Sequence, residues 1–198
     1  MLSKNFPLGR VILFITGNIH KFNEARRILS EYGIATAMLK IKKAEIQDDN
    51  LENIARTGAL EAFKECGLPL IVEDAGLFIK ALKGFPGPYS SYVCRTIGNS
   101  GILKLMEGIA DRYAQFRSVV AYCNPEGLVK CFVGISEGRI AEEARGRSGF
   151  GFDPIFEPFG GGGRTFAEMS TDEKNMFSHR SRAFKKFEEY YRSLKQSF

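Results

Sequence analysis

Two adjacent carboxylates, Glu73 and Asp74, could bind a metal ion or accept a proton. They follow the apolar residues 70–72, an expected buried strand, and ligands of open α/β sheets bind where strands end. Side chains alternate along a strand, so the two carboxylates should point to opposite sides and should not share one ion unless the strand has already ended. Oxygen ligands for magnesium could also come from three carboxylates before the second expected helix: Glu45, Asp48 and Asp49. The alternative is that this stretch is simply a solvated helix start.

A second candidate site lies where the first expected strand, residues 11–15, meets the first expected helix. Thr16, Gly17 and Asn18 form this junction, and Lys21 follows within the first helical turn. Backbone N–H groups at a helix N-terminus, a glycine and a lysine can together bind phosphate. The segment matches neither of the two common Gly-rich nucleotide motifs, so an ordinary strand-to-helix turn is the alternative interpretation.

An aromatic turn further along the chain could bind a nucleotide base. Gly151 separates the rings of Phe150 and Phe152, and Asp153 closes the turn with a carboxylate. Aromatic faces stack on bases, and a glycine leaves room for a flat ligand. The alternative is a core role for both rings, because the chain has 17 phenylalanines.

A cluster of basic residues near the C-terminus could contact an anionic ligand. Lys174 precedes an expected helix start at Ser178, and His179 and Arg180 would lie in the first turn of that helix. Cations are poorly placed there for the helix dipole, which indicates an anionic or carbonyl-bearing ligand.

Apolar periodicity predicts the elements that would position these residues. Strands are expected at residues 11–15, 35–40, 70–72, 118–123 and 128–136, and helices after Lys21, at about 51–66, at 92–106 with a break at 98–101, and at 171–194 with Thr171 or Ser178 as caps. Alternating strands and helices favour an α/β class with parallel pairing at its centre. The turn at residues 124–127 adds an antiparallel hairpin, so the sheet should be mixed.

The composition is that of a globular protein and excludes disorder, collagen and coiled coil. The chain has 198 residues, of which 44% are hydrophobic and 26% charged. The longest apolar run, residues 11–15, is far shorter than the roughly 20 residues of a membrane helix. We therefore expect one soluble, cytoplasmic domain over residues 1–198, with reduced cysteines. Residues 174–198 carry seven Lys and Arg against two Glu, which is either a solvated face or a nucleic-acid patch.

Five segments together resemble the inosine triphosphate pyrophosphatase family, most closely its archaeal members. The resemblance runs from Val11 to about Tyr190. The five segments occur in the family's order and spacing and are residues 16–21, 72–77, 84–90, 150–154 and 178–180. The resemblance implies an elongated, twisted mixed β-sheet flanked by helices, with two lobes and a cleft between them. It also implies a homodimer that uses magnesium to hydrolyse inosine, deoxyinosine and xanthosine triphosphates to the monophosphate and pyrophosphate.

The resemblance further implies a role for each site residue. The triphosphate would be held by Thr16, Gly17, Asn18, Ile19, His20 and Lys21, and Lys21 would neutralise charge as pyrophosphate leaves. Glu45 and Asp74 would hold magnesium, Asp74 would accept the proton of the attacking water, and Ala75 would lie against the substrate. Purine contacts would come from Phe150, Gly151, Phe152 and Asp153, with Lys174, His179 and Arg180 reaching the remaining edge and the phosphates.

Base selection would follow from hydrogen bonding. Hypoxanthine and xanthine present an oxygen at position 6 that accepts from a donor such as Arg180 or a backbone N–H, whereas the amino group of adenine would leave that donor unpaired. We expect Arg180→Ala to lower selectivity for inosine over adenosine triphosphate more than it disturbs folding. Two alternatives remain open: a Maf-type pyrophosphatase acting on modified pyrimidine nucleotides, and a non-catalytic protein whose nucleic-acid affinity falls steeply with salt.

Overall fold

The computed structural model describes residues 11–41 and 46–196, with side chains described as far as residue 194. The strands are β1 (Val11–Ile15), β2 (Ala35–Leu39), β3 (Leu70–Ile79), β4 (Pro86–Gly87), β5 (Tyr113–Cys123), β6 (Val129–Ile140) and β7 (Phe156–Pro158). The α-helices are α1 (Ile19–Ser30), α2 (Leu51–Cys66), α3 (Ser90–Thr96), α4 (Gly98–Leu105), α5 (Thr171–Phe177) and α6 (His179–Gln196). Short 3₁₀ helices cover Lys80–Leu82, Asp153–Ile155 and Phe166–Glu168.

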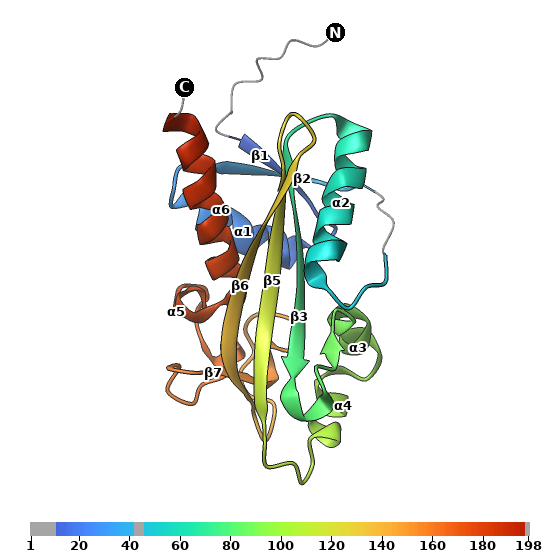
Figure 1. Cartoon of the computed structure of the whole chain (residues 1–198). Helices are drawn as coiled ribbons and strands as arrows, with labels where there is room; N and C mark the ends of the chain where they lie inside the picture. Colours follow the sequence, from blue (N-terminus) through green and yellow to red (C-terminus); the bar gives the residue numbers. More distant parts are fainter. Residues whose placement is uncertain (1–10, 42–45, 197–198) are drawn as a thin grey trace.

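The strands form one seven-stranded sheet. The sheet is mixed, as the sequence predicts. Its order is β2-β1-β3-β5-β6-β7, and β4 pairs with the end of β3. β1 pairs in parallel with β2 and β3, whereas β3, β5, β6 and β7 pair antiparallel. Figure 1 shows β3, β5 and β6 running along most of the length of the molecule, which makes the sheet elongated and twisted.

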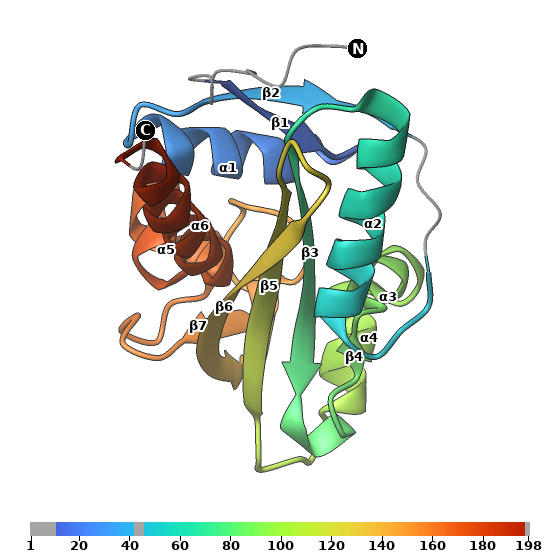
Figure 2. The same cartoon turned by 45° about the horizontal axis from the view of Figure 1, so that its top comes forward.

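Helices cover both faces of this sheet. On one face α1 and α6 bury a core that includes Phe14, Ile71 and Phe184, and on the other α2 buries a core that includes Ala59 and Val72. Figure 2 shows α1 lying beside α6, with α2 on the opposite side of the long strands. A third core lies toward the far end of the sheet, around α3 and α4. The two lobes and the cleft between them stay a prediction, as does a single domain over residues 1–198.

Three strands are longer than the sequence predicts. β3 continues to Ile79 because β5 pairs with it residue by residue, from Leu70 opposite Cys123 to Ile79 opposite Ala114. This pairing satisfies the backbone hydrogen bonds of a segment that is only intermittently apolar. The expectation that the strand ends before Glu73 is therefore wrong, and both acidic residues lie mid-strand. β5 and β6 are likewise longer than expected, and their antiparallel hairpin is confirmed.

The helical predictions need only small corrections. The helix expected at residues 92–106 is divided into α3 and α4 at Ile97. Ser178 is confirmed as a cap, since its Oγ accepts from the backbone N–H of Arg180 at 3.1 Å. The other cap is Ser170 rather than Thr171, because the Ser170 side chain forms a capping box with Glu173. All four cysteines carry free thiols, and no helix in the described ranges is long and apolar enough to cross a membrane.

Basic side chains cover one edge of the sheet. Across the described residues, β6 pairs with β7 only from Gly138 onward, so residues 129–136 form an edge. Arg182 and Lys186 of α6 donate to the carbonyls of Ile135 and Val133 at 2.5 and 2.7 Å. Unpaired strand edges can pair with other chains, and cationic side chains are one means by which proteins prevent this.

We expect the Arg182→Ala/Lys186→Ala variant to aggregate severalfold faster than wild type, because two edge carbonyls lose their donors. Light scattering at rising protein concentration measures this. The matched control is Lys185→Ala/Arg192→Ala, which removes the same charge from exposed positions of the same helix. Equal aggregation of the two variants would mean that net charge, and not the edge, controls association.

Candidate active site

The turn between β1 and α1 is built from local hydrogen bonds. Asn18 caps α1, since its Oδ1 accepts from the backbone N–H groups of His20 and Lys21 at 2.9 and 3.2 Å. Thr16 Oγ1 accepts from the N–H of Asn18 at 3.1 Å. No described atom lies within 4 Å of a Cβ built on Gly17, so the space in front of this helix end is open. The turn thus has the geometry of an anion site at a helix N-terminus.

Glu73 and Asp74 point to opposite faces of the sheet, as alternation predicts. Glu73 is buried on the α1 and α6 side, where its carboxylate contacts Lys21 Nζ at 2.9 Å, Arg180 Nε at 3.1 Å and Ser118 Oγ at 2.6 Å. Asp74 stands two residues after Val72 on the same strand, so its side chain points to the same face, which α2 covers, and it is half-buried. The two carboxylates consequently lie in different environments.

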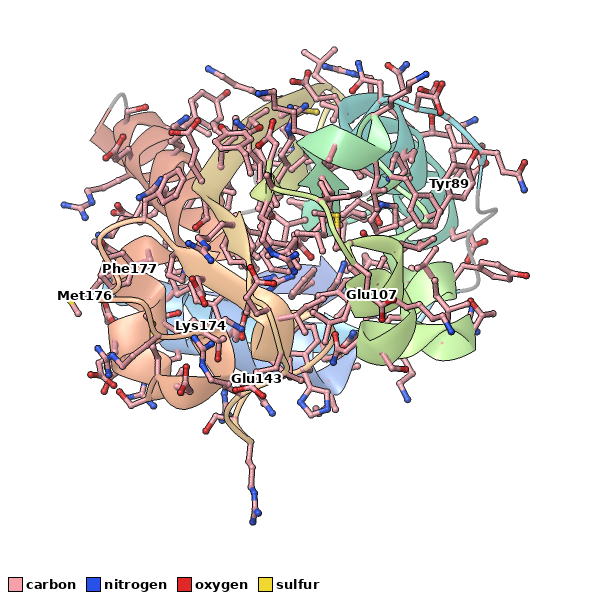
Figure 3. The ribbon with its side chains drawn as sticks, turned by 90° about the horizontal axis from the view of Figure 1, so that it is seen from below. Tyr89, Glu107, Glu143, Lys174, Met176 and Phe177 are labelled. Carbon is pink, nitrogen blue, oxygen red and sulfur yellow. The ribbon has the colours of Figure 1, made fainter. Side chains whose placement is uncertain are left out.

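A buried network of alternating charges connects five parts of the chain: α1, β3, the aromatic turn, α5 and α6. Arg180, which contacts Glu73, also contacts Glu24 on α1, with Nη1 2.6 Å from one carboxylate oxygen. Lys174 Nζ lies 2.8 Å from the other oxygen of Glu24. Lys174 also contacts Asp153 at 2.6 Å. The side chain of Lys174 is 4% exposed and that of Arg180 3% exposed, so water screens these pairs little. Figure 3 shows Lys174 inside the molecule, whereas Met176 of the same helix lies at its margin.

Sequence reasoning missed Glu24. A signal was available, because Glu24 stands next to Ala25 on the apolar face of α1, where an unpaired carboxylate would be costly. A carboxylate on a buried face requires cationic partners. Those partners come from residues about 150 positions away, so the sequence could indicate the need but not the identity of the partners.

The charges in this network change the pKa of its members. Burial alone would raise the pKa of Glu24 and of Glu73, but the nearby cations and hydrogen bonds together outweigh it and hold each pKa below its ordinary value: Arg180 and Lys174 act on Glu24, and Arg180 and Lys21 act on Glu73. Burial alone would lower the pKa of Arg180, but Glu73 and Glu24 raise it. Burial raises the pKa of Asp153 despite its contact with Lys174. Both glutamates therefore stabilise the folded state above the ordinary glutamate pKa of about 4.3, and this contribution is lost as the pH falls.

The aromatic turn is anchored by its own carboxylate. Asp153 Oδ2 accepts from the N–H of Phe150 at 2.8 Å, and a Cβ on Gly149 would lie 2.1 Å from that oxygen, so only glycine fits there. Phe152 is 3% exposed and packs in the core near α3 and α4. Of the two rings expected to frame a base, only Phe150 is therefore accessible. Gly151 accepts a hydrogen bond from Asn99 on α4 at its carbonyl.

The histidine of the basic cluster is buried. His179 stacks on Phe116 with ring centroids 4.6 Å apart, and burial holds its pKa well below the ordinary value, so the ring is neutral at pH 7. Among the described residues, no hydrogen-bond partner lies near its Nδ1. The direct role predicted for His179 toward phosphate would require this buried nitrogen to become accessible.

A pocket of about 640 Å³ opens beside the network. It lies between α1, the aromatic turn and the start of α5, and its lining includes His20, Glu24, Gly149, Phe150 and Thr171. The volume is within the range of about 300–1,000 Å³ that is usual for small-molecule sites. Of the predicted base and phosphate residues, His20 and Phe150 line this pocket, and Glu24 connects it to Lys174 and Arg180 of the network.

Of the residues predicted to hold magnesium, the structure describes Asp74 but not Glu45. Glu45 lies outside the described residues, and the described part of the chain holds no group of three or more His, Cys, Asp or Glu that could bind a metal. Asp48 is used locally, because its carboxylate accepts from Asn50 N at 2.7 Å and Asn53 Nδ2 at 2.9 Å at the start of α2. The half-buried carboxylate of Asp74 has the hard-oxygen chemistry that fits magnesium.

Comparison with known proteins identifies the relatives of this chain. A model of the Ham1 family matches residues 12–190. The chain belongs to the Ham1 family. A protein named dITP/XTP pyrophosphatase from Methanopyrus kandleri is 53% identical over 92% of this chain and 96% of that protein, and one of the same name from Saccharolobus solfataricus is 51% identical over 98% and 97%. A Ham1 protein from Coxiella burnetii, 29% identical, has a similar structure, with a TM-score of 0.81 over 92% of this chain and 98% of that one. The resemblance to archaeal pyrophosphatases, which the five sequence segments predict, is confirmed.

Proposed function

We propose that this chain hydrolyses deoxyinosine, inosine and xanthosine triphosphates to the nucleoside monophosphate and pyrophosphate. The name shared by its archaeal relatives indicates the substrate class. The observation that carries the proposal is the buried network, since it links Lys21 beside the open helix end to Asp153 below the aromatic turn. One rigid connection thus spans a phosphate-type site and a base-type pocket.

In the proposed mechanism, the N-terminus of α1 and Lys21 bind the triphosphate. Water attacks the α-phosphorus, the bond from this phosphorus to the bridging oxygen breaks, and pyrophosphate leaves with that oxygen. Asp74 accepts the proton of the water, and Lys21 neutralises charge on the leaving group. Magnesium, held by Asp74 and Glu45, would supply positive charge to the phosphate oxygens when bound.

Base recognition is proposed to centre on Phe150. Its ring is half-buried, and the cations Lys174 and Arg180 lie 5.1 and 5.4 Å from its centroid. Arg180 is the proposed donor to an oxygen at position 6 of a purine stacked on this ring. Asp153 and Lys174 hold the turn, and Phe152 anchors it to the core.

The experiment that tests this function is a substrate panel. Pyrophosphate release from inosine, xanthosine, adenosine and guanosine triphosphates is measured with magnesium and with a chelator. We expect magnesium-dependent release from the first two, with adenosine triphosphate hydrolysed at least about a hundredfold more slowly, because mismatched donors are left unpaired. Equal rates on all four would discard the base-reading roles, and absence of release would remove the proposed function.

Two alternatives receive less support. The nucleic-acid interpretation used the basic C-terminal segment, but two of its cations, Lys174 and Arg180, are consumed in buried ion pairs. The Maf-type interpretation is disfavoured by the Ham1 match over most of the chain. A homodimer and a cytoplasmic location remain part of the proposal, and sedimentation of the purified protein tests the first of them.

A further inference from the structure

We propose that His20 is the second wall of the base pocket, so that a purine inserts between its imidazole and the ring of Phe150. This inference rests on the proposed function and deepens it. It also reassigns His20, which the sequence resemblance groups with the residues that hold the triphosphate.

The first observation is the ring contact itself. The imidazole of His20 and the ring of Phe150 have centroids 5.2 Å apart and planes inclined by 20°, which is a stacked arrangement. The two residues belong to different elements, α1 and the aromatic turn, and both line the 640 Å³ pocket. His20 is exposed and lies nearly parallel to the ring of Phe150. It thus occupies the position that a base stacked on Phe150 would take.

The second observation is the direction from which His20 approaches. Lys174 and Arg180, whose side chains are 4% and 3% exposed, lie near Phe150 from the interior. His20 is instead exposed to solvent and reaches the same ring from the first turn of α1. Its neighbour Lys21 faces Glu73 instead, with Nζ 2.9 Å from that carboxylate. Consecutive residues of α1 thus face two different parts of the site, and the imidazole is on the base side.

The third observation concerns which ring can move. Carbon atoms of stacked groups pack at about 3.5–4.0 Å, so a planar base between two rings needs them roughly 7 Å apart. The spacing of 5.2 Å must therefore increase when a base enters. Phe150 is tied to Asp153 through its backbone N–H, and Asp153 is tied to Lys174. His20 projects from the first turn of a helix into solvent, and rotation of its side chain provides the space.

The test separates base binding from phosphate binding by using two probes, inosine monophosphate and inorganic tripolyphosphate. Calorimetry measures the Kd of each for wild type, His20→Ala and His20→Phe. We expect His20→Ala to raise the Kd for inosine monophosphate roughly tenfold, because one stacking contact is lost. His20→Phe should restore it to within about twofold, and the Kd for tripolyphosphate should change little in either variant. Glu31→Ala, at the exposed C-cap of α1 and outside the pocket lining, controls for general effects on the helix.

The outcomes are distinct from those of the proposed function. If wild type binds inosine monophosphate and His20→Ala binds it equally well, the role of His20 is overturned while the function stands. A parallel loss of both probes in His20→Ala would assign His20 to phosphate instead. If wild type binds neither probe and hydrolyses none of the four triphosphates, the proposed function itself fails.

Discussion

Asp74→Asn is expected to fold as wild type does and to hydrolyse inosine triphosphate about 10²- to 10⁴-fold more slowly, the usual range for loss of a general base. An amide cannot accept the proton of water and offers no full negative charge to a cation. Because Asp74 is half-buried on a central strand and similar in size to asparagine, the packing of β3 against α2 should be retained. Initial rates at saturating substrate and magnesium, with thermal unfolding in parallel, measure the two effects.

The matched control for this prediction is Asp111→Asn. Asp111 is also an aspartate, but it is exposed before β5 and pairs with Lys80 at 2.9 Å, far along the sheet from the proposed site. Its replacement should leave turnover within about twofold of wild type, because exposed ion pairs contribute little to stability. Near-normal turnover by Asp74→Asn would remove Asp74 from the mechanism, whereas equal losses in both variants would point to a general electrostatic effect.

Arg180→Ala is expected to reduce the free energy of unfolding by about 3–5 kcal/mol, the cost of removing one partner from a buried ion-pair network. The guanidinium contacts Glu24 at 2.6 Å and Glu73 at 3.1 Å, so two buried carboxylates from α1 and β3 would lose their shared cation. The sequence alone predicted an effect on selectivity more than on folding. Burial of Arg180 shows that the folding effect must be large, and the selectivity effect remains a separate prediction.

Urea denaturation at pH 7 and near pH 4 tests the origin of this loss. In the variant, Glu24 keeps only Lys174 and Glu73 only Lys21, so protonation of the two glutamates relieves their excess negative charge, and the difference in stability from wild type should narrow at the lower pH. A cavity effect alone would be independent of pH. Arg27→Ala is the control, since Arg27 on α1 and its partner Asp172 are 50% and 68% exposed, and its loss should cost roughly 0.2–1 kcal/mol. Comparable destabilisation by both variants would contradict the special position of Arg180.

Local sequence determined the features that depend on neighbouring residues. The turn from β1 into α1 follows from an apolar run, a glycine and the capping side chain of Asn18, all within eight residues. The opposite orientation of Glu73 and Asp74 follows from strand geometry alone. The hairpin at residues 124–127 and the cap at Ser178 were predictable for the same reason, because each is stabilised by contacts only a few residues apart.

The tertiary structure decided what depends on distant partners. β3 extends past its apolar residues because β5, more than 30 residues later, supplies its hydrogen bonds. Phe150 and Phe152 are both aromatic and only two positions apart, yet one lines the pocket and the other packs in the core. Glu24 acquires its role from Lys174 and Arg180, which only the packing of α1 against the C-terminal helices brings within ion-pair distance. Burial and long-range charge pairing arise when the chain folds, and for that reason no local pattern specifies them.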